Sequence, residues 1–268
     1  MRTYSLKCDC HTHTLYSRHA YSTIAENVRA AKEQGLELLA STDHFSAMLY
    51  PDWRDERNYQ YFYGYQMWPR IWDGVRLLHG AEVDITRLDG SLFGEDVPVS
   101  HSTVGEPASR PWSLFSYAVR NCDFLIASVH GTQFASGCTE EQAARMYCSA
   151  MMRPRVLMIG HPGRSGVAFD IDEVVKFARD HHRLIELNEH SSDRFYGEDG
   201  VCRKIAEACM RFGTQVAVDT DAHICTNIGR FSRVEKMLGE IDFPEELIAT
   251  RDKETFEKAL SDAQLFME

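Results

Sequence analysis

The sequence lacks the motifs by which several common enzyme and binding classes are recognised. It has no Walker or GxGxxG nucleotide-binding loop, no nucleophile elbow typical of serine hydrolases, and no zinc-finger spacing of cysteines. Its eight cysteines include no CxxC pair. Since a chain of 268 residues can bury a sizeable core, a disulfide framework is not needed, and we expect reduced thiols in a cytoplasmic protein.

An excess of positive charge and long apolar runs are also missing. The 29 lysines and arginines are outnumbered by 40 acidic residues, which gives a net charge of -11 at pH 7. Because nucleic acids and anionic membranes bind basic surfaces, we expect neither of them as a partner. No stretch is apolar over the length of a membrane span, and residues 1–6 do not have the apolar character of a signal peptide.

What the sequence does contain is an alternation of short apolar runs and helical patterns. Seven runs are typical of buried strands: 6–13, 36–42, 75–83, 123–129, 155–160, 184–187 and 215–218. Helices are expected over 22–35, with Ser22 as N-cap, and over 67–74, 113–120, 139–151, 171–181, 201–212, 231–238, 244–249 and 253–266. The aromatic segment 45–65 is either a pocket wall or a surface loop, and 84–112 has room for a small hairpin. Alternating strands and helices predict a parallel sheet, either open or closed into a barrel.

Histidines and acidic residues mark the ends of these strands. The candidates at or just after strand ends are His11, His13, His44, Glu82, His130, His161, Asp221 and His223, and His19 follows in the first loop. In a βα barrel the loops after the strands converge on one face, whereas an open sheet would spread these residues along a line. We therefore predict an α/β barrel of seven strands with its site at their C-terminal ends.

The first strand carries the densest group of candidates. If it is regular, Asp9, His11 and His13 share one face, while Cys8 and Cys10 point the other way, under a covering helix. Four other histidines, His79, His101, His181 and His182, are expected to be structural or solvated.

Nine candidate ligands are more than one metal ion needs. Because a catalytic zinc takes about three protein ligands, the set suits two or three ions, with Glu82 free to bridge. Imidazole and carboxylate together suit zinc, manganese or iron. Such clusters hydrolyse phosphate esters, amides and cyclic imides, and their charge would attract a phosphate that the acidic surface does not. Arg18, Arg164 and His190 are candidates for contact with the substrate.

Six motifs follow one another from Asp9 to His223: DCHTH, STDH, GAEVD, SVH, IGHPG and VDTDAH. In residue type, order and spacing they resemble the motifs of the PHP (polymerase and histidinol phosphatase) superfamily. The segments SRHAYST and MWPRIWDGV are most similar to the bacterial YcdX-type phosphatases. The resemblance implies one PHP domain over residues 1–268, a distorted TIM-like barrel of seven strands, a trinuclear site that usually holds zinc, and phosphoesterase activity.

The resemblance also implies a division of the ligands. His11, His13, Glu82 and Asp221 would hold one ion, Glu82 would bridge to a second ion held by His130 and His161, and His19, His44 and His223 would hold a third. His13, Glu82 and Asp221 would then act in catalysis through a metal-bound hydroxide. Segments 87–121 and 131–155 depart from the YcdX-type pattern beside the site, so the resemblance implies no particular alcohol in the substrate.

The leading hypothesis is a metal-dependent phosphatase acting on small-molecule phosphoric monoesters; the sequence does not indicate its oligomeric state. An amidohydrolase-type enzyme that cleaves C–N bonds is a second hypothesis, since HxH and a final Asp on barrel strands also occur there. The lack of a bridging lysine at a clear strand end argues against it. A non-catalytic metal-binding PHP scaffold is the third, and the complete ligand set argues against that one.

Overall fold

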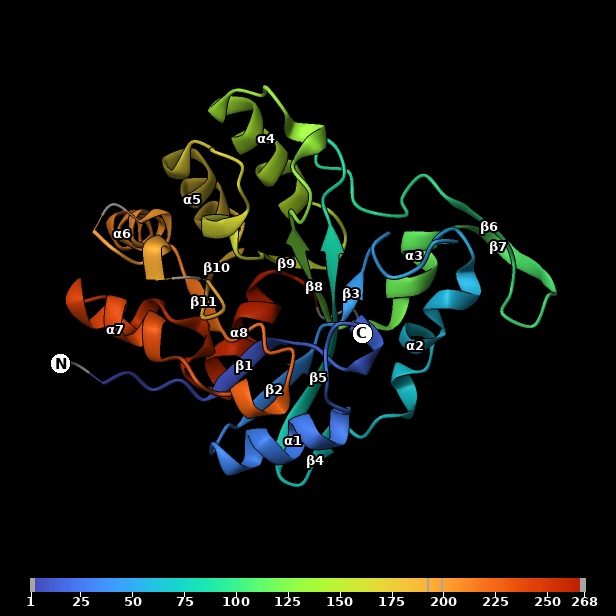
Figure 1. Ribbon diagram of the computed structural model, residues 1–268, viewed down its shortest axis with the longest axis horizontal. Helices are drawn as coiled ribbons and strands as arrows, with labels where there is room; N and C mark the ends of the chain where they lie inside the picture. Colours follow the sequence, from blue (N-terminus) through green and yellow to red (C-terminus); the bar gives the residue numbers. More distant parts are fainter. Residues whose placement is uncertain (1–2, 192, 199, 266–268) are drawn as a thin grey trace.

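A nearly closed barrel of parallel strands forms the centre of the molecule. The computed structural model describes residues 3–191, 193–198 and 200–265. The strands follow one another around the barrel in the order β1 (Cys8–Thr12), β2 (Leu38–Ser41), β5 (Val75–Asp84), β8 (Phe124–Ser128), β9 (Val156–Ile159), β10 (Leu184–Asn188) and β11 (Val216–Asp219). Two short strands, β3 (His44–Phe45) and β4 (Ile71–Trp72), also pair with β5. The predicted seven-stranded barrel is confirmed (Figure 1).

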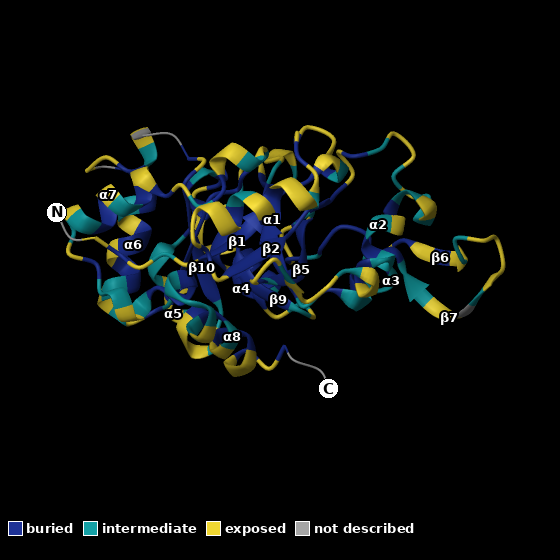
Figure 2. Cartoon of the chain, turned by 90° about the horizontal axis from the view of Figure 1, so that it is seen from below, coloured by how far each residue is buried: buried dark blue, intermediate teal, exposed yellow. Residues whose placement is uncertain are grey.

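Helices surround the barrel and bury its outer face. They are α1 (Ile24–Glu33), α2 (Gln60–Tyr63), α3 (Leu114–Ala118), α4 (Glu140–Met151), α5 (Ile171–Asp180), α6 (Val201–Phe212), α7 (Ser232–Glu240) and α8 (Lys253–Asp262). Within the described residues, none of them combines the length and the apolar character needed to cross a bilayer. A hairpin of β6 (Pro98–His101) and β7 (Pro107–Ser113) projects to one side beside α3, and Figure 2 shows that its outer part is largely exposed.

Threonine caps set the starts of two of the longer helices. Thr23 and Thr139 each form a capping box, with Glu26 and Gln142 respectively, which satisfies backbone N–H groups of the first turn. The prediction of Ser22 as the N-cap was therefore wrong by one residue. The Ser22 hydroxyl instead accepts a hydrogen bond from the backbone N–H of Cys225, at 2.8 Å.

Helix α8 closes the N-terminal end of the barrel. Its Phe256 and Leu260 are buried in one cluster with side chains near the starts of the strands, and the rings of Phe256 and Phe124 are 5.6 Å apart. Cys8 and Cys10 belong to the same cluster, so they pack under a covering helix as expected. That end of the barrel is therefore filled by apolar side chains, and the opposite end is left for polar groups.

Strand β1 departs from regular alternation. Its register against β2 shifts between Asp9 and Thr12. The prediction that Asp9 shares a face with His11 and His13 was wrong because this irregularity breaks the two-residue period. Asp9 instead accepts hydrogen bonds from the backbone N–H groups of Thr220 and Gly229, at 3.0 and 3.1 Å.

Two buried carboxyl groups join β1 to β11, where the barrel has no regular ladder. Asp9 accepts from the Thr220 hydroxyl at 2.6 Å in addition to the backbone groups above, and Asp219 accepts from the backbone N–H of Cys10, also at 2.6 Å. Burial raises the pKa of Asp9 to about 6. Burial, together with the nearby Glu186 and Asp9, raises the pKa of Asp219 well above its ordinary value. We call this contact between β1 and β11 the Asp9 seam. Near neutral pH it does not place two full negative charges in the core.

Four less regular segments were also predicted from the sequence. The prediction of a helix over 67–74 was wrong, because Ile71 and Trp72 pair with the start of β5 as the antiparallel strand β4. Residues 244–249 form short 3-10 turns instead of a helix, and residue 266 lies outside the described residues. Strands β6 and β7 form the hairpin expected within 84–112, although β7 extends to Ser113. The aromatic segment buries Tyr59, Phe62 and Tyr65 completely, so much of it is core.

The Asp9 seam yields a first prediction. Replacing Asp9 by alanine leaves two backbone N–H groups without their acceptor, so we expect the free energy of unfolding to fall by roughly 2–4 kcal/mol. Urea denaturation measures this change. Thr220→Val removes only one hydroxyl bond to Asp9 and should cost about 1 kcal/mol. Equal losses in the two variants would contradict the role given to the Asp9 carboxylate.

Candidate metal centre

The nine predicted ligands lie together at the C-terminal end of the barrel. Strands β1, β3 and β5 and the segments after β8, β9 and β11 supply seven of them, and His13 and His19 follow β1. Three groups of these side chains have ligand atoms within 4.8 Å of one another: His11, His13 and Glu82; His44, Glu82 and His130; and His13, His44 and His223. The structure thus brings all the sequence candidates for metal binding into one region.

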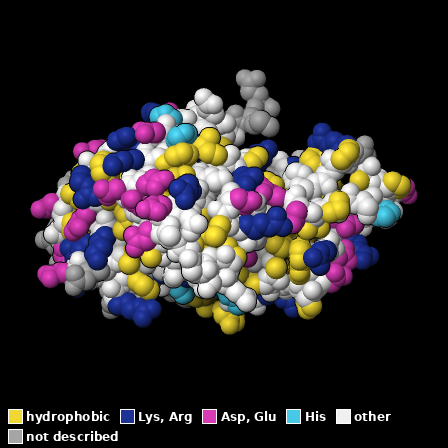
Figure 3. Space-filling view, turned by 90° about the horizontal axis from the view of Figure 1, so that it is seen from above, with side chains coloured by type: hydrophobic (Ala, Val, Ile, Leu, Met, Phe, Trp, Pro, Cys, Tyr) yellow, Lys and Arg dark blue, Asp and Glu magenta, His cyan; other side chains and the backbone are white. Residues whose placement is uncertain are grey.

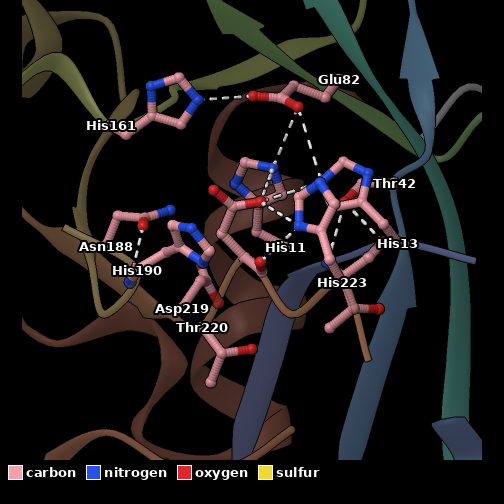
Figure 4. A network of polar contacts seen from close by, with 12 residues as sticks. His11, His13, Thr42, Glu82, His161, Asn188, His190, Asp219, Thr220 and His223 are labelled. Atoms are coloured by element: carbon pink, nitrogen blue, oxygen red, sulfur yellow. Dashed lines mark hydrogen bonds and ion pairs between the residues drawn. The ribbon is translucent and has the colours of Figure 1, made fainter. Parts of the chain in front are cut away.

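Glu82 lies at the centre of this region. Its Oε1 is 2.7 Å from Nε2 of His161 and 3.2 Å from Nε2 of His130. Its Oε2 is 2.8 Å from Nδ1 of His44 and 3.4 Å from Nε2 of His11. Figure 4 shows the carboxylate between His161 on one side and His11 and His13 on the other. A carboxylate whose two oxygens face different imidazoles can bridge two ions.

Asp221 and the outer histidines continue the cluster toward the surface. Oδ1 of Asp221 is 3.1 Å from Nε2 of His13. Nε2 of His19 is 3.0 Å from Nε2 of His223 and 3.3 Å from Nε2 of His44, so three imidazole nitrogens converge. His19 is exposed, whereas His11, His13 and Glu82 are completely buried.

Unpartnered polar atoms show that this donor set fits metal ions. Within the described residues, six buried side-chain atoms of the candidate ligands form no hydrogen bond, although several of them face one another at 2.8–3.6 Å: Nε2 of His11, Nε2 of His13, Nδ1 of His44, Oε2 of Glu82, Nδ1 of His161 and Oδ1 of Asp221. A buried polar atom without a partner costs about 1–3 kcal/mol, so several of them in one place need an explanation. Divalent cations bound by imidazole nitrogen and carboxylate oxygen would satisfy atoms of this kind.

The protonation of the cluster follows from the same geometry. Burial alone would raise the pKa of Glu82, but His130, His11 and His44 hold it well below its ordinary value. Burial would likewise raise the pKa of Asp221, which His11 and His13 lower well below its usual range. Burial lowers the pKa of His161 and of His223, so both are neutral and able to act as ligands at pH 7.

Glu186, near the middle of β10, supports two of the candidate ligands from behind. Its Oε1 is 2.7 Å from Nδ1 of His11, and its Oε2 accepts the backbone N–H of His161 at 2.5 Å. The first contact fixes the proton of His11 on Nδ1, which leaves Nε2 free for a metal. The second holds the backbone of His161 in the left-handed conformation, with φ of 32°, which residues other than glycine rarely adopt.

Two further carboxylates orient histidines in the same way. Oδ1 of Asp84 lies 2.7 Å from Nδ1 of His130, and the carboxylates of Glu82 and Asp84 raise the pKa of this imidazole to about 10 although burial opposes them. The Ser17 hydroxyl is 3.0 Å from Nδ1 of His13 and donates to Asp43. These roles of Glu186, Asp84, Asp43 and Ser17 were not predicted from the sequence. Asp84 and Asp43 nevertheless stand inside the motifs GAEVD and STDH.

A cavity of about 390 Å³ opens over the outer part of the cluster. It is lined by Tyr21, Met48, Arg164 and His190 together with five of the candidate ligands. Arg164 contacts Oδ2 of Asp221, and its Nε is buried without a partner among the described residues. Of the predicted substrate contacts, Arg164 and His190 thus face the cavity. Arg18 does not line it, and its guanidinium instead lies over the ring of Tyr50, 5.1 Å from the centroid.

The four histidines expected to be structural lie outside the cluster. His79 is buried on β5, with its ring 4.8 Å from that of Tyr65 and 5.1 Å from that of Trp68. His181 stacks on Phe177, with ring centroids 3.9 Å apart. His101 lies on the projecting hairpin, and His182 follows α5. None of the four belongs to a group of candidate ligands among the described residues.

The support that Glu186 gives to His11 and His161 yields a second prediction. Glutamine has one acceptor oxygen, so Glu186→Gln cannot accept from both partners, and we expect zinc affinity to fall about 10- to 100-fold. Competition with a chromophoric chelator measures this affinity without reference to any reaction.

Glu189→Gln provides a matched control for that variant. Glu189 is also buried, three residues further along, but it accepts the backbone N–H groups of Arg233 and Val234 at the start of α7. We expect this variant to lose stability and to keep its zinc affinity. Wild-type zinc affinity in Glu186→Gln would refute the positioning role.

The chain is similar in sequence to known proteins. The family model described as the PHP domain matches residues 9–193. A protein of Clostridium novyi named as a probable phosphatase is 34% identical over 91% of this chain and 90% of its own length. A probable phosphatase of Caldicellulosiruptor saccharolyticus is 34% identical, with 94% of each chain covered.

One solved structure extends the comparison to the fold. The histidinol phosphate phosphatase of Lactococcus lactis, crystallised with zinc, L-histidinol and phosphate, aligns with a TM-score of 0.53 and 16% identity. The alignment covers 89% of this chain and 95% of that one, and it supports the barrel assignment. Together with the sequence relatives it confirms the resemblance inferred from the six motifs: the chain belongs to the PHP domain family.

Proposed function

We propose that this protein is a metal-dependent phosphatase that hydrolyses small phosphoric monoesters with two or three divalent ions. The observation that carries the proposal is the set of unpartnered imidazole and carboxylate atoms around Glu82 and Asp221. The relatives that are a third identical over most of their length are named probable phosphatases, which supports the class of reaction.

Zinc is the metal that we propose first. The Lactococcus lactis phosphatase was crystallised with zinc and phosphate, and the donor set here is the nitrogen and oxygen set that zinc accepts. Manganese and iron accept the same ligands, so they remain alternatives within the proposal.

The proposed division of ligands is the one that the family resemblance implies, and it differs in part from the three groups whose ligand atoms lie close together. His11, His13, Glu82 and Asp221 would hold one ion, and Glu82 would bridge to a second one at His130 and His161. The converging nitrogens of His19, His44 and His223 would hold the third. The two oxygens of Glu82 support its bridging role, since Oε1 lies toward His130 and His161 and Oε2 toward His11. Oε2 is also 2.8 Å from Nδ1 of His44, so the third set of ligands adjoins the first two.

The protein side chains have distinct tasks in this proposal. Bound divalent ions would polarise the phosphate and lower the pKa of water, which is the chemistry that imidazoles and carboxylates cannot supply alone. Arg164 would bind a phosphate oxygen through the N–H group that has no partner here. His190, Tyr21 and Met48, at the cavity wall, would contact the alcohol half of the ester.

We also propose that residues 1–268 form one PHP domain and that the protein is cytoplasmic. The family model ends at residue 193, but β11 supplies the last strand of the barrel, and Asp221 and His223 follow it. A site assembled from both sides of residue 193 supports a single domain, because neither part contains all the candidate ligands.

The direct test is phosphate release from an aryl phosphate by purified protein. We expect activity to disappear after chelation and to return with zinc or manganese, and His13→Ala to lower kcat/KM more than about 100-fold while the protein remains folded by circular dichroism. Unchanged turnover in His13→Ala would contradict the assignment. Cleavage of cyclic amides, with no release of phosphate from any ester, would favour the amidohydrolase hypothesis instead.

A second variant tests the phosphate contact. We expect Arg164→Ala to raise KM about tenfold or more, because a hydrogen bond to a charged group is lost. Arg18→Ala should change KM less than about twofold, since Arg18 lies on Tyr50 outside the cavity. Equal effects of the two substitutions on KM would contradict the selective role of Arg164.

A further inference from the structure

A second hollow lies beside the barrel, away from the metal centre. Its volume is about 1010 Å³, and it is bounded by α3, the end of β7 and the turn between α4 and β9. Residues 119–121 and 153–155 in its wall stand just before β8 and β9. Because the barrel strands are parallel, this hollow faces the starts of the strands, whereas His130 and His161 follow their ends.

Four arginines surround this hollow in a chain whose net charge is -11. They are Arg110, Arg120, Arg153 and Arg155, and the one acidic residue in the wall is Glu95. Arg153 is 3.5 Å from Glu95. For the other three, no ion pair with a carboxylate occurs among the described residues. Figure 3 shows, by contrast, that basic and acidic side chains are interspersed over much of one face of the molecule.

The three arginines without a carboxylate are held by aromatic rings and backbone oxygens. Arg110 stacks on Trp112, with Cζ 3.8 Å from the ring centroid. Cζ of Arg120 lies 4.1 Å from the ring centroid of Tyr117. Arg155 donates to the carbonyl oxygens of Cys122 and Arg120, at 2.6 and 3.1 Å. These contacts fix the guanidinium groups in place but leave their charge uncompensated.

We propose that this arginine-lined hollow binds a small anion carrying two or more phosphate groups. Guanidinium groups bind phosphate through paired N–H donors, and immobilised ones lose less entropy on binding. The size of the hollow suits a single metabolite-sized ligand. A long nucleic acid is disfavoured, because the net charge of -11 would repel it. The proposed site is separate from the metal centre, because the two cavities share no lining residue.

The probe for this site is methylenediphosphonate, whose P–C–P linkage resists hydrolysis. Isothermal titration of the zinc-loaded protein is expected to show binding that weakens as salt is raised. Arg110→Glu should weaken it at least about tenfold, the factor expected from losing a hydrogen bond to a charged group, and Arg110→Gln should weaken it less. Arg110 is exposed, and among the described residues its stacking on Trp112 is its one side-chain interaction, so both variants should fold.

Arg54→Glu is the matched control. Arg54 is also an exposed arginine stacked on a tryptophan, with Cζ 4.2 Å from the ring of Trp53, but it lies outside this hollow. We expect its affinity for the probe to stay within twofold of wild type, and His13→Ala, altered in the metal centre, also to retain binding.

Three results would overturn the proposal. They are the absence of binding, equal weakening by Arg110→Glu and Arg54→Glu, and binding that is lost in His13→Ala but kept in Arg110→Glu. The last of these would place the anion at the metal centre. None of them bears on phosphatase activity, which is measured separately.

Discussion

The buried carboxylate of Glu82 is the constraint on which the rest of the site depends. An ionised carboxylate in a protein interior is costly unless opposite charge or hydrogen-bond donors surround it. Here histidines from four other segments face its two oxygens. These imidazoles can compensate the charge only if the C-terminal ends of the strands that carry them lie close together. A barrel brings these strand ends together on one face, whereas an open sheet would spread them along a line. The metal ions that we propose would take over this compensation and release the histidines to act as neutral ligands.

A second layer of carboxylates makes that arrangement specific. Glu186, Asp84 and Asp43 stand behind His11, His130 and Ser17, and each lies on or beside a barrel strand. An imidazole that donates one N–H to a fixed acceptor presents its other nitrogen in one direction. The layer also explains the backbone at His161, where a left-handed conformation is stabilised by a hydrogen bond to Glu186. Several acidic residues of this chain thus orient the candidate metal ligands, in addition to contributing to its net negative charge.

The two ends of the barrel have opposite chemistry. Helix α8 and the cysteines of β1 fill the N-terminal end with apolar side chains, so the polar cluster is confined to the other end. Beside the filled end, the segment that departs from the YcdX-type pattern contributes the β6–β7 hairpin and α3. The arginine-lined hollow is formed in part by this segment. The segment whose sequence differs from the YcdX-type pattern therefore forms part of the hollow outside the barrel. The binding role proposed for this hollow is separate from catalysis.

The sequence by itself determined the barrel and the set of candidate ligands. Strand ends can be found from apolar runs, and a histidine or acidic residue at nearly every one of them, such as His44 or His161, has no other common cause. Only the tertiary structure decided how the side chains face one another. The register shift in β1 moved Asp9 away from the histidines, and Arg18 and Arg164, which look alike in sequence, lie respectively outside and inside the cavity. Local patterns specify secondary structure, but irregular registers and loop paths depend on contacts between residues far apart in the chain, and these contacts leave no periodic signal in the sequence.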